Sequence, residues 1–186
     1  MGIVRVSTSL SLDGYMAGPD HDMDWVFEYG SDVPGDVVQD LIDTTGAILA
    51  GRGSYNVGRR STRPETSKPF GGRWSGPQFV LTHHPPDDEQ DPSIAFISGD
   101  VREAVATALE AAGGKNVLIF GANIANQALA EGLVDDILII LMPLILGGGV
   151  RLFGTDGGER IDLEPIAITP SGRLATLHYR VVKSTE

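Results

Sequence analysis

An arginine held between two glycines is the first feature of this sequence that could bind a ligand. Residues 51–53 (Gly-Arg-Gly) follow the apolar run 47–50, and two hydroxyl side chains, Ser54 and Tyr55, come next. A guanidinium can donate two parallel hydrogen bonds to a phosphate, and glycine allows a ligand to approach the backbone closely. The same residues would also suit a tight turn at the end of a strand. This segment alone therefore predicts either a phosphate site or a turn.

Two other apolar runs end in small or hydroxyl-bearing residues. The run 77–82 ends at Thr82, and the run 117–120 leads into residues 121–123 (Gly-Ala-Asn) at the start of a helical pattern. Ligands of open α/β sheets bind beyond the carboxyl ends of the strands, and helix N-termini present free N–H groups to anions. Together with the arginine, these strand ends suit a dinucleotide that carries a pyrophosphate and an extra 2′-phosphate. The alternative is that each glycine only serves a turn.

The spacing of apolar residues predicts the strands and helices that would position these strand ends. β-Branched and apolar runs favour strands, and amphipathic spacing followed by glycine favours helices. Strands that alternate with helices and have unbroken apolar interiors are typical of an α/β fold around a mostly parallel sheet. The expected strands are 3–10, 47–51, 77–82, 94–98, 115–121 and 137–146, and the expected helices are 32–46, 100–114 and 123–132.

Two local signals in this framework are clear. Asp100 is placed to cap the second of the helices, with Glu103 three residues later in the capping-box position. Residues 170–172 (Pro-Ser-Gly) predict a turn that joins strands 166–169 and 173–182 into a terminal antiparallel hairpin. The expected surface loops are 54–76, which is basic and glycine-rich, and 83–92, which is proline-rich and acidic.

Composition narrows the class of protein. The 186 residues suit a single domain spanning 1–186, and the net charge of −11 disfavours nucleic acid and anionic membranes as partners. The longest apolar run, 137–146, is too short to span a bilayer, and the N-terminal segment lacks the pattern of a signal peptide. The chain has no cysteine, which removes disulfides and thiolate chemistry and fits a reducing cytosol. We therefore expect a cytoplasmic protein.

Metal and hydrolase motifs find no support. The acidic stretch 20–25 resembles the start of a calcium loop, but Trp25 and Ser31 stand where an EF-hand needs glycine and glutamate. His83 and His84 are adjacent and so point in different directions, and we expect no metal site. There is no Walker A sequence, nucleophile elbow or zinc-protease motif. The glycine-rich stretch 147–154 favours a turn over a dinucleotide fingerprint, because no helical pattern follows it.

The sequence resembles the dihydrofolate reductase-like superfamily, and specifically the stand-alone relatives of the reductase domain of riboflavin biosynthesis. The resemblance implies a three-layer fold with a mostly parallel central sheet of about eight strands, which the terminal hairpin fits. It also implies NADPH as hydride donor and a homodimer, for which the apolar region 137–146 is our candidate surface. The matching segments, in the expected order, are 9–20, 22–25, 48–55, 80–85, 117–137 and 143–153.

The resemblance also implies cofactor contacts, residue by residue. Arg52 matches the position that grips the 2′-phosphate. Ala122 and Asn123 depart from the more glycine-rich pattern of the family, although asparagine tolerates left-handed backbone geometry. The other implied contacts are Gly51, Ser54 and Tyr55 beside the arginine, Leu81, Thr82 and His83 at the adenosine ribose, Gly121 and Ile124 in the pyrophosphate loop, and Met16, Ala17 and Gly18 over the nicotinamide.

Catalysis would also need a proton source beside the hydride donor. In folate reductases an acid on the first helix takes part in protonation, and Asp36, Asp40 and Asp43 are the candidates here. Asp36 lies nearest the expected place, whereas exposed helical acids are the alternative. Trp25 resembles the tryptophan that lines the substrate cavity in those enzymes, and it suits a core position equally well.

Two functions remain open from the sequence. The first is an NADPH-dependent reductase that transfers hydride to a pterin-like, pyrimidine-like or similar heterocycle. The second is a non-catalytic protein of the same fold that binds NADP(H) or another nucleotide. If the substrate carries a phosphate, basic side chains in the cavity would bind it. The alternative is that these basic residues belong to an exposed loop and contact only solvent. The candidates are Arg59, Arg60, Lys68, Arg73 and Arg151.

Overall fold

The computed structural model describes residues 2–61, 63, 67–154 and 158–183. Its centre is an eight-stranded sheet of order β5-β4-β3-β6-β1-β7-β10-β9. The strands from β5 to β7 are parallel, and β10 and β9 are antiparallel. The predicted mostly parallel sheet with a terminal hairpin is thus confirmed. The strands are β1 (Val4–Ser11), β3 (Thr45–Gly51), β4 (Gln78–Leu81), β5 (Ile94–Ile97), β6 (Asn116–Phe120), β7 (Asp136–Met142), β9 (Leu163–Ser171) and β10 (Leu174–Val181).

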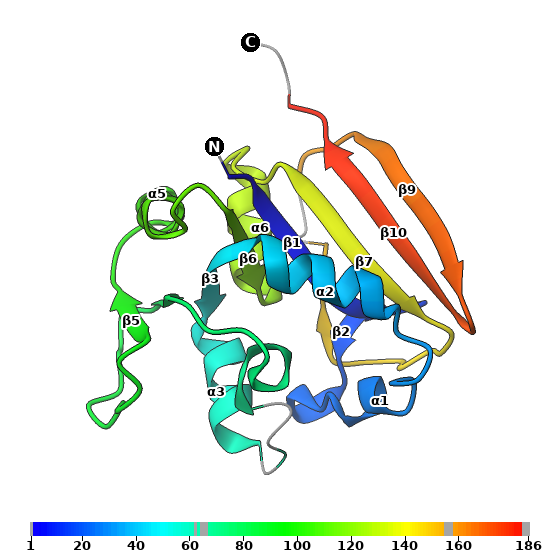
Figure 1. Ribbon diagram of the computed structural model, residues 1–186, viewed down its shortest axis with the longest axis horizontal. Coiled ribbons are helices and arrows are strands. Elements are labelled where there is room, and N and C mark those ends of the chain that lie inside the picture. The colour runs from blue at the N-terminus through cyan, green and yellow to red at the C-terminus, as the bar shows by residue number, and fades with distance from the viewer. Residues whose placement is uncertain (1, 62, 64–66, 155–157, 184–186) are drawn as a thin grey trace.

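Helices cover both faces of this sheet, as a three-layer fold requires. Helix α2 (Gly35–Thr44) crosses one face, where Leu41 packs with Ile48 and Leu118. Helices α5 (Val101–Ala111) and α6 (Ala122–Ala130) pack on the other face against alternate residues of the same strands. Figure 1 shows α2 in front of the sheet, with α3 (Arg52–Arg60) and α1 (Asp24–Phe27) below it. Within the described residues, no helix is long and apolar enough to cross a membrane.

The helix cap predicted at Asp100 is present. Its side chain accepts a hydrogen bond from the backbone N–H of Glu103 at 2.8 Å, which satisfies one of the free donors of the first turn of α5. The terminal hairpin also forms about a left-handed Gly172, with φ of +56°.

Three expectations about the elements were wrong. The segment 54–76 is not all loop, because α3 continues to Arg60. The strand expected to reach residue 146 ends at Met142, immediately before Pro143. Strand β9 is longer than the predicted 166–169, because Pro165 and Pro170 interrupt its apolar pattern, whereas β10 is shorter than the predicted 173–182.

Candidate functional site

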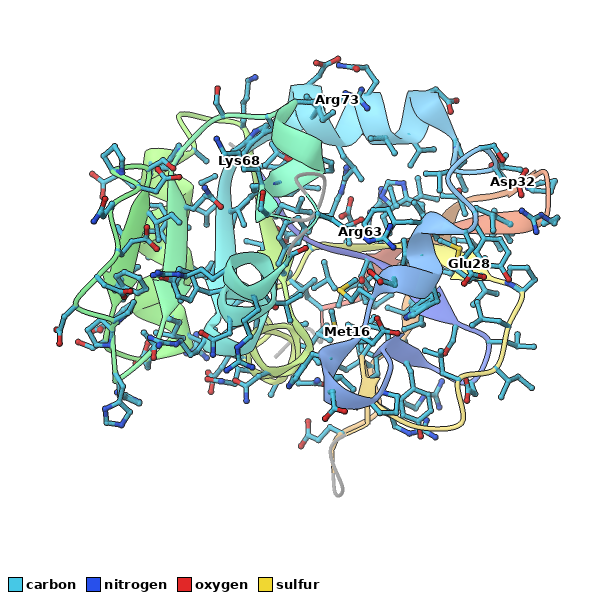
Figure 2. The ribbon with its side chains drawn as sticks, turned by 90° about the horizontal axis from the view of Figure 1, so that it is seen from below. Met16, Glu28, Asp32, Arg63, Lys68 and Arg73 are labelled. Atoms are coloured by element: carbon cyan, nitrogen blue, oxygen red, sulfur yellow. The ribbon has the colours of Figure 1, made fainter. Side chains whose placement is uncertain are left out.

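A cavity of about 1180 Å³ opens where the parallel strands end. Its walls come from β1, β3, β4 and β6, from α1 and α3, and from the loop that follows β4. Figure 2 looks onto this edge from below, with Met16 on one side and Lys68 on the other. The position beyond the carboxyl ends of parallel strands is the one at which α/β sheets bind ligands.

Most of the cofactor-binding residues predicted from the sequence meet at this cavity. Gly18, Thr82 and His83 belong to the same segments but are not among the lining residues. The predicted residues that do line it are Met16, Ala17, Gly51, Arg52, Ser54, Tyr55, Leu81, Gly121, Ala122, Asn123 and Ile124.

Two helix N-termini abut at the centre of the cavity wall. Helix α3 begins after Gly51, and a Cβ added there would lie 3.1 Å from Cγ1 of Ile124 in α6. Helix α6 begins after Gly121, whose φ is +102°, and a Cβ there would overlap the Ser54 hydroxyl of α3. The close approach therefore requires glycine at position 121, and a side chain at position 51 would make a tight contact with Ile124. The free first-turn N–H groups of two helices face one region, which suits an anion with more than one phosphate.

The Arg52 guanidinium is held in a defined orientation beside this pair of helices. Its Nε donates to Oδ1 of Asn56 at 3.1 Å, and its Nη1 donates to the carbonyl oxygen of His84 at 2.6 Å. The guanidinium carbon also lies 5.4 Å from the centre of the Tyr55 ring. A planar cation fixed in this way loses little further freedom when it binds a phosphate.

The acidic loop after β4 is fastened to α3 by a cluster around Tyr55. The Arg59 guanidinium donates to the Tyr55 hydroxyl at 2.8 Å and pairs with Asp88 at 3.0 Å, and the Tyr55 hydroxyl donates to Glu89 at 2.5 Å. Burial raises the pKa of Tyr55, and the hydrogen bond from Tyr55 holds the pKa of Glu89 below its usual value. The Tyr55 ring also meets Phe96 edge-on at 5.4 Å. This cluster fixes one wall of the cavity.

The contacts of Arg59 with Asp88 and of Tyr55 with Glu89 were not predicted from the sequence. Tyr55 and Arg59 are four residues apart and therefore share one face of a helix, but this spacing has meaning only once 52–60 is known to be helical.

The glycine run after β7 positions the segment that contains Met16. Strand β2 (Tyr15–Ala17) pairs with β8 (Val150–Arg151). Gly149 has φ of +124°, and a Cβ there would overlap the carbonyl oxygen of Ala17. The glycine-rich stretch is thus a turn, as predicted, and it allows the two segments to touch.

Asp13 ties the same turn to the end of β1. Its carboxylate accepts hydrogen bonds from the Ser11 hydroxyl at 2.7 Å and from the backbone N–H groups of Leu146 and Gly147 at 3.1 and 2.8 Å. These donors, the Ser11 hydroxyl most of all, lower the pKa of Asp13 to about 2. Asp13 therefore organises the turn.

The structure does not bring the acid candidates Asp36, Asp40 and Asp43, or Trp25, to the cavity. Trp25 is buried in the core under α2, and its indole N–H donates to the carbonyl of Asp22 at 3.2 Å. Asp36 is exposed on α2, and neither it nor Asp40 or Trp25 is among the lining residues. Their catalytic role stays a prediction.

Asp40 instead faces a buried ion pair at the opposite edge of the sheet. Its carboxylate lies 3.5 Å from Nη1 of Arg5, and Arg5 pairs with Asp136 at 2.7 Å. His178 contacts the same Asp136 at 2.9 Å. Arg5 and Asp136 stand at the amino-terminal ends of β1 and β7, whereas the cavity lies at their carboxyl ends.

The basic candidates divide between the cavity and other contacts. Arg59 and Lys68 line the cavity. Arg73 donates to Gln39 of α2 at 2.9 Å, and Arg151 donates to the carbonyl of Asp13 at 3.2 Å. Arg60 is exposed and is not among the lining residues.

Comparison with known proteins identifies the family that this chain resembles. Residues 57–175 match the RibD C-terminal domain family. The uncharacterized protein YwjB of Bacillus subtilis is 28% identical over 174 residues, which are 92% of this chain and 93% of YwjB.

Two solved structures show the same fold. A protein from Shewanella sp. PV-4 named for riboflavin biosynthesis is 24% identical, with a TM-score of 0.77 over 97% of this chain and 99% of that one. The dihydrofolate reductase of Enterococcus faecalis, complexed with NADP(H), is 15% identical, with a TM-score of 0.67 over 98% of both chains.

Proposed function

Because the chain belongs to the RibD C-terminal domain family, we propose that it is an NADPH-dependent reductase that transfers hydride to a small pterin-like, pyrimidine-like or similar conjugated heterocycle. The observation that carries this proposal is the meeting of two helix N-termini beside a fixed arginine at the carboxyl edge of the sheet. A relative of the same fold, the Enterococcus faecalis reductase, is complexed with NADP(H).

The residues at this edge fit the cofactor group by group. Arg52 would hold the 2′-phosphate, the first-turn N–H groups of α3 and α6 would hold the pyrophosphate, and Leu81 with Thr82 and His83 would lie beside the adenosine ribose. The segment Met16–Gly18 would cover the nicotinamide, fixed by Gly149 and Asp13. When bound, NADPH supplies the hydride.

The proton has three proposed sources, Asp36, Asp40 and water. Ser7, Thr8 and Ser9 of β1 are among the lining residues, and a hydroxyl group that reaches the cavity here would relay a proton from water. An Asp36→Asn variant that keeps its turnover would support this route.

A titration with NADPH, followed by a turnover assay with heterocyclic acceptors, tests the proposed function. We expect the protein to bind NADPH and to oxidise it only when an acceptor is present, as measured by the loss of nicotinamide absorbance. Binding without turnover for any acceptor would favour the alternative, a non-catalytic NADP(H)-binding protein. A parent protein that binds neither NADPH nor NADP would contradict both functions.

We further propose that the protein is a cytoplasmic homodimer, and burial limits which part of the predicted region 137–146 could form the dimer surface. Strand β7 lies between β1 and β10, and its side chains Ile137 to Ile140 are at most 7% exposed, so they cannot meet a second copy. Ile145, in the remaining part of the predicted region, is 71% exposed, and the edge strand β9 exposes Ile166 by 47% and Ile168 by 59%. An exposed apolar edge strand is a template for pairing with another chain.

The molar mass in solution tests this surface. We expect twice the chain mass for the parent protein and a monomer for Ile168→Lys, because a charge on the edge opposes burial. A parent protein that is monomeric at all concentrations, or a dimeric Ile168→Lys variant, would contradict the proposal. Lys183→Ala, on the coil after β10, is the control and should stay dimeric.

A further inference from the structure

Phe70 adopts a backbone conformation that few residues other than glycine adopt. Its φ is +52° and its ψ is 34°, within the turn η2 (Pro69–Gly72), where Gly71 and Gly72 also have positive φ. Such a conformation disfavours side chains that carry a Cβ, and strained residues of this kind concentrate at ligand clamps and active sites. A phenylalanine at this position therefore calls for a reason beyond the turn itself.

The ring of Phe70 forms part of the cavity wall on the α2 face of the sheet. Its centre lies 6.3 Å from that of Phe120, with the planes inclined by 56°, and both rings are half-buried. Phe120 is the last residue of β6, immediately before Gly121 of the helix pair. The two rings thus lie between the proposed cofactor site and the part of the cavity that remains for a substrate. The other apolar side chains lining this part are Met23, Val26, Phe27 and Ile48.

Neighbouring contacts hold the η2 turn against the sheet and α2. Trp74 is buried and donates its indole N–H to the carbonyl of Thr45 at 3.0 Å. Arg73 donates to Gln39 of α2, and the backbone N–H of Gly71 donates to the carbonyl of Lys68 at 3.1 Å. These contacts hold the η2 turn in place, and Phe70 lines the cavity from this turn.

Two cations that line the cavity lie near carboxylates. Arg59 pairs with Asp88. Lys68 lies close enough to Asp91 to help lower the pKa of that carboxyl, although hydrogen bonds from Ser93 lower it most. A sugar phosphate entering here would have to compete with these carboxylates, whereas a planar aromatic ring would meet apolar and aromatic side chains.

We infer that Phe70 determines substrate specificity, and that with Phe120 it forms a wall against which the ring of a planar aromatic substrate without a ribosyl phosphate packs. This inference rests on the proposed function and narrows its substrate class. The hydride and the proton are supplied as proposed above, so Phe70 has no part in the chemical step and acts by binding the ring.

Binding of two unreactive probes to the NADP-saturated protein tests the inference. Quinazolinedione is a planar, uncharged bicycle, and uridine monophosphate carries a related dione ring on a ribosyl phosphate. We expect quinazolinedione to bind at least about tenfold more tightly, by calorimetry or fluorescence titration. Equal or tighter binding of uridine monophosphate would overturn the inference.

Variants of Phe70 give the second arm of the test. Phe70→Leu should weaken quinazolinedione binding about tenfold, and Phe70→Tyr, which keeps the ring, should retain it. Phe153→Leu is the matched control, because Phe153 is half-exposed and is not among the lining residues. NADP affinity should be unchanged in all three variants, which reports that they are folded.

The outcomes separate this inference from the proposed function. Unchanged quinazolinedione binding in Phe70→Leu, with NADP binding intact, would overturn the role of Phe70 alone. Failure of the parent protein to bind NADP(H) would overturn the proposed function, and the inference with it.

Discussion

Replacing Arg52 with alanine should weaken NADPH binding by about 10- to 100-fold and leave NADH binding within about threefold. NADPH carries a 2′-phosphate that NADH lacks, and Arg52 is the cation that the structure fixes at this end of the cavity, through Asn56 and the carbonyl of His84. Removing the guanidinium removes its charge-assisted hydrogen bonds to the 2′-phosphate, and the affinity for NADPH falls accordingly. The measurement is a parallel titration with the two cofactors.

The control for this variant is Arg60→Ala on the same helix. Arg60 is exposed and is not among the lining residues, so its removal changes the net charge equally but touches no part of the site. Both cofactors should bind the control as they bind the parent protein. If Arg52→Ala weakens the two cofactors equally, the arginine acts on the fold of the site and not on the 2′-phosphate.

The framework of the fold could be predicted because its signals are local. The cap at Asp100, the apolar runs of β3 and β6 and the turn at Gly172 each depend on a few neighbouring residues, and all are present. Strands that alternate with helices form only a few sheet topologies. The ends of β3, β4 and β6, which are far apart in the sequence, could therefore be assigned to one edge of the sheet.

Helix α3 could not be predicted from the sequence because tertiary contacts, and not local propensity, stabilise it. It contains Gly53 and Gly58 and begins directly at a strand end, so its helix propensity is low. What holds it is the packing of Tyr55 on Phe96 and the contacts of Arg59 with the acidic loop, and these partners are about thirty to forty residues away in the sequence.

The positions of the acidic side chains Asp36 and Asp40 also could not be predicted from the sequence. The sequence places Asp36 and Asp40 on one helix, but it does not fix the direction of each side chain. In the structure Asp40 turns toward Arg5, a residue that no motif singled out. The partner of Arg5 is Asp136, which lies on a strand that is adjacent only in the folded sheet.

The contact between the helix N-termini predicts the other large effect. Gly121→Ala should lower the free energy of unfolding by about 1–3 kcal/mol, because φ of +102° with ψ of 139° is essentially closed to residues with a Cβ. It should also weaken NADPH and NADH alike, by about tenfold or more, since both carry the pyrophosphate that the two helices would hold. Urea unfolding and the same parallel titration measure the two effects.

A double-mutant cycle with Ser54 separates the causes of this loss. The added Cβ would overlap the Ser54 hydroxyl, whereas the Ser54 Cβ would lie at an ordinary 3.6 Å. Ser54→Ala should therefore recover the steric part of the loss in Gly121→Ala but not the backbone part. Gly35→Ala in the first turn of α2 is the control, because a Cβ there meets nothing within 4 Å and Gly35 is not among the lining residues, and it should leave binding unchanged. Additive effects of the Gly121 and Ser54 substitutions would show that the two helices do not press on one another, and the proposed pyrophosphate site would lose its main structural support.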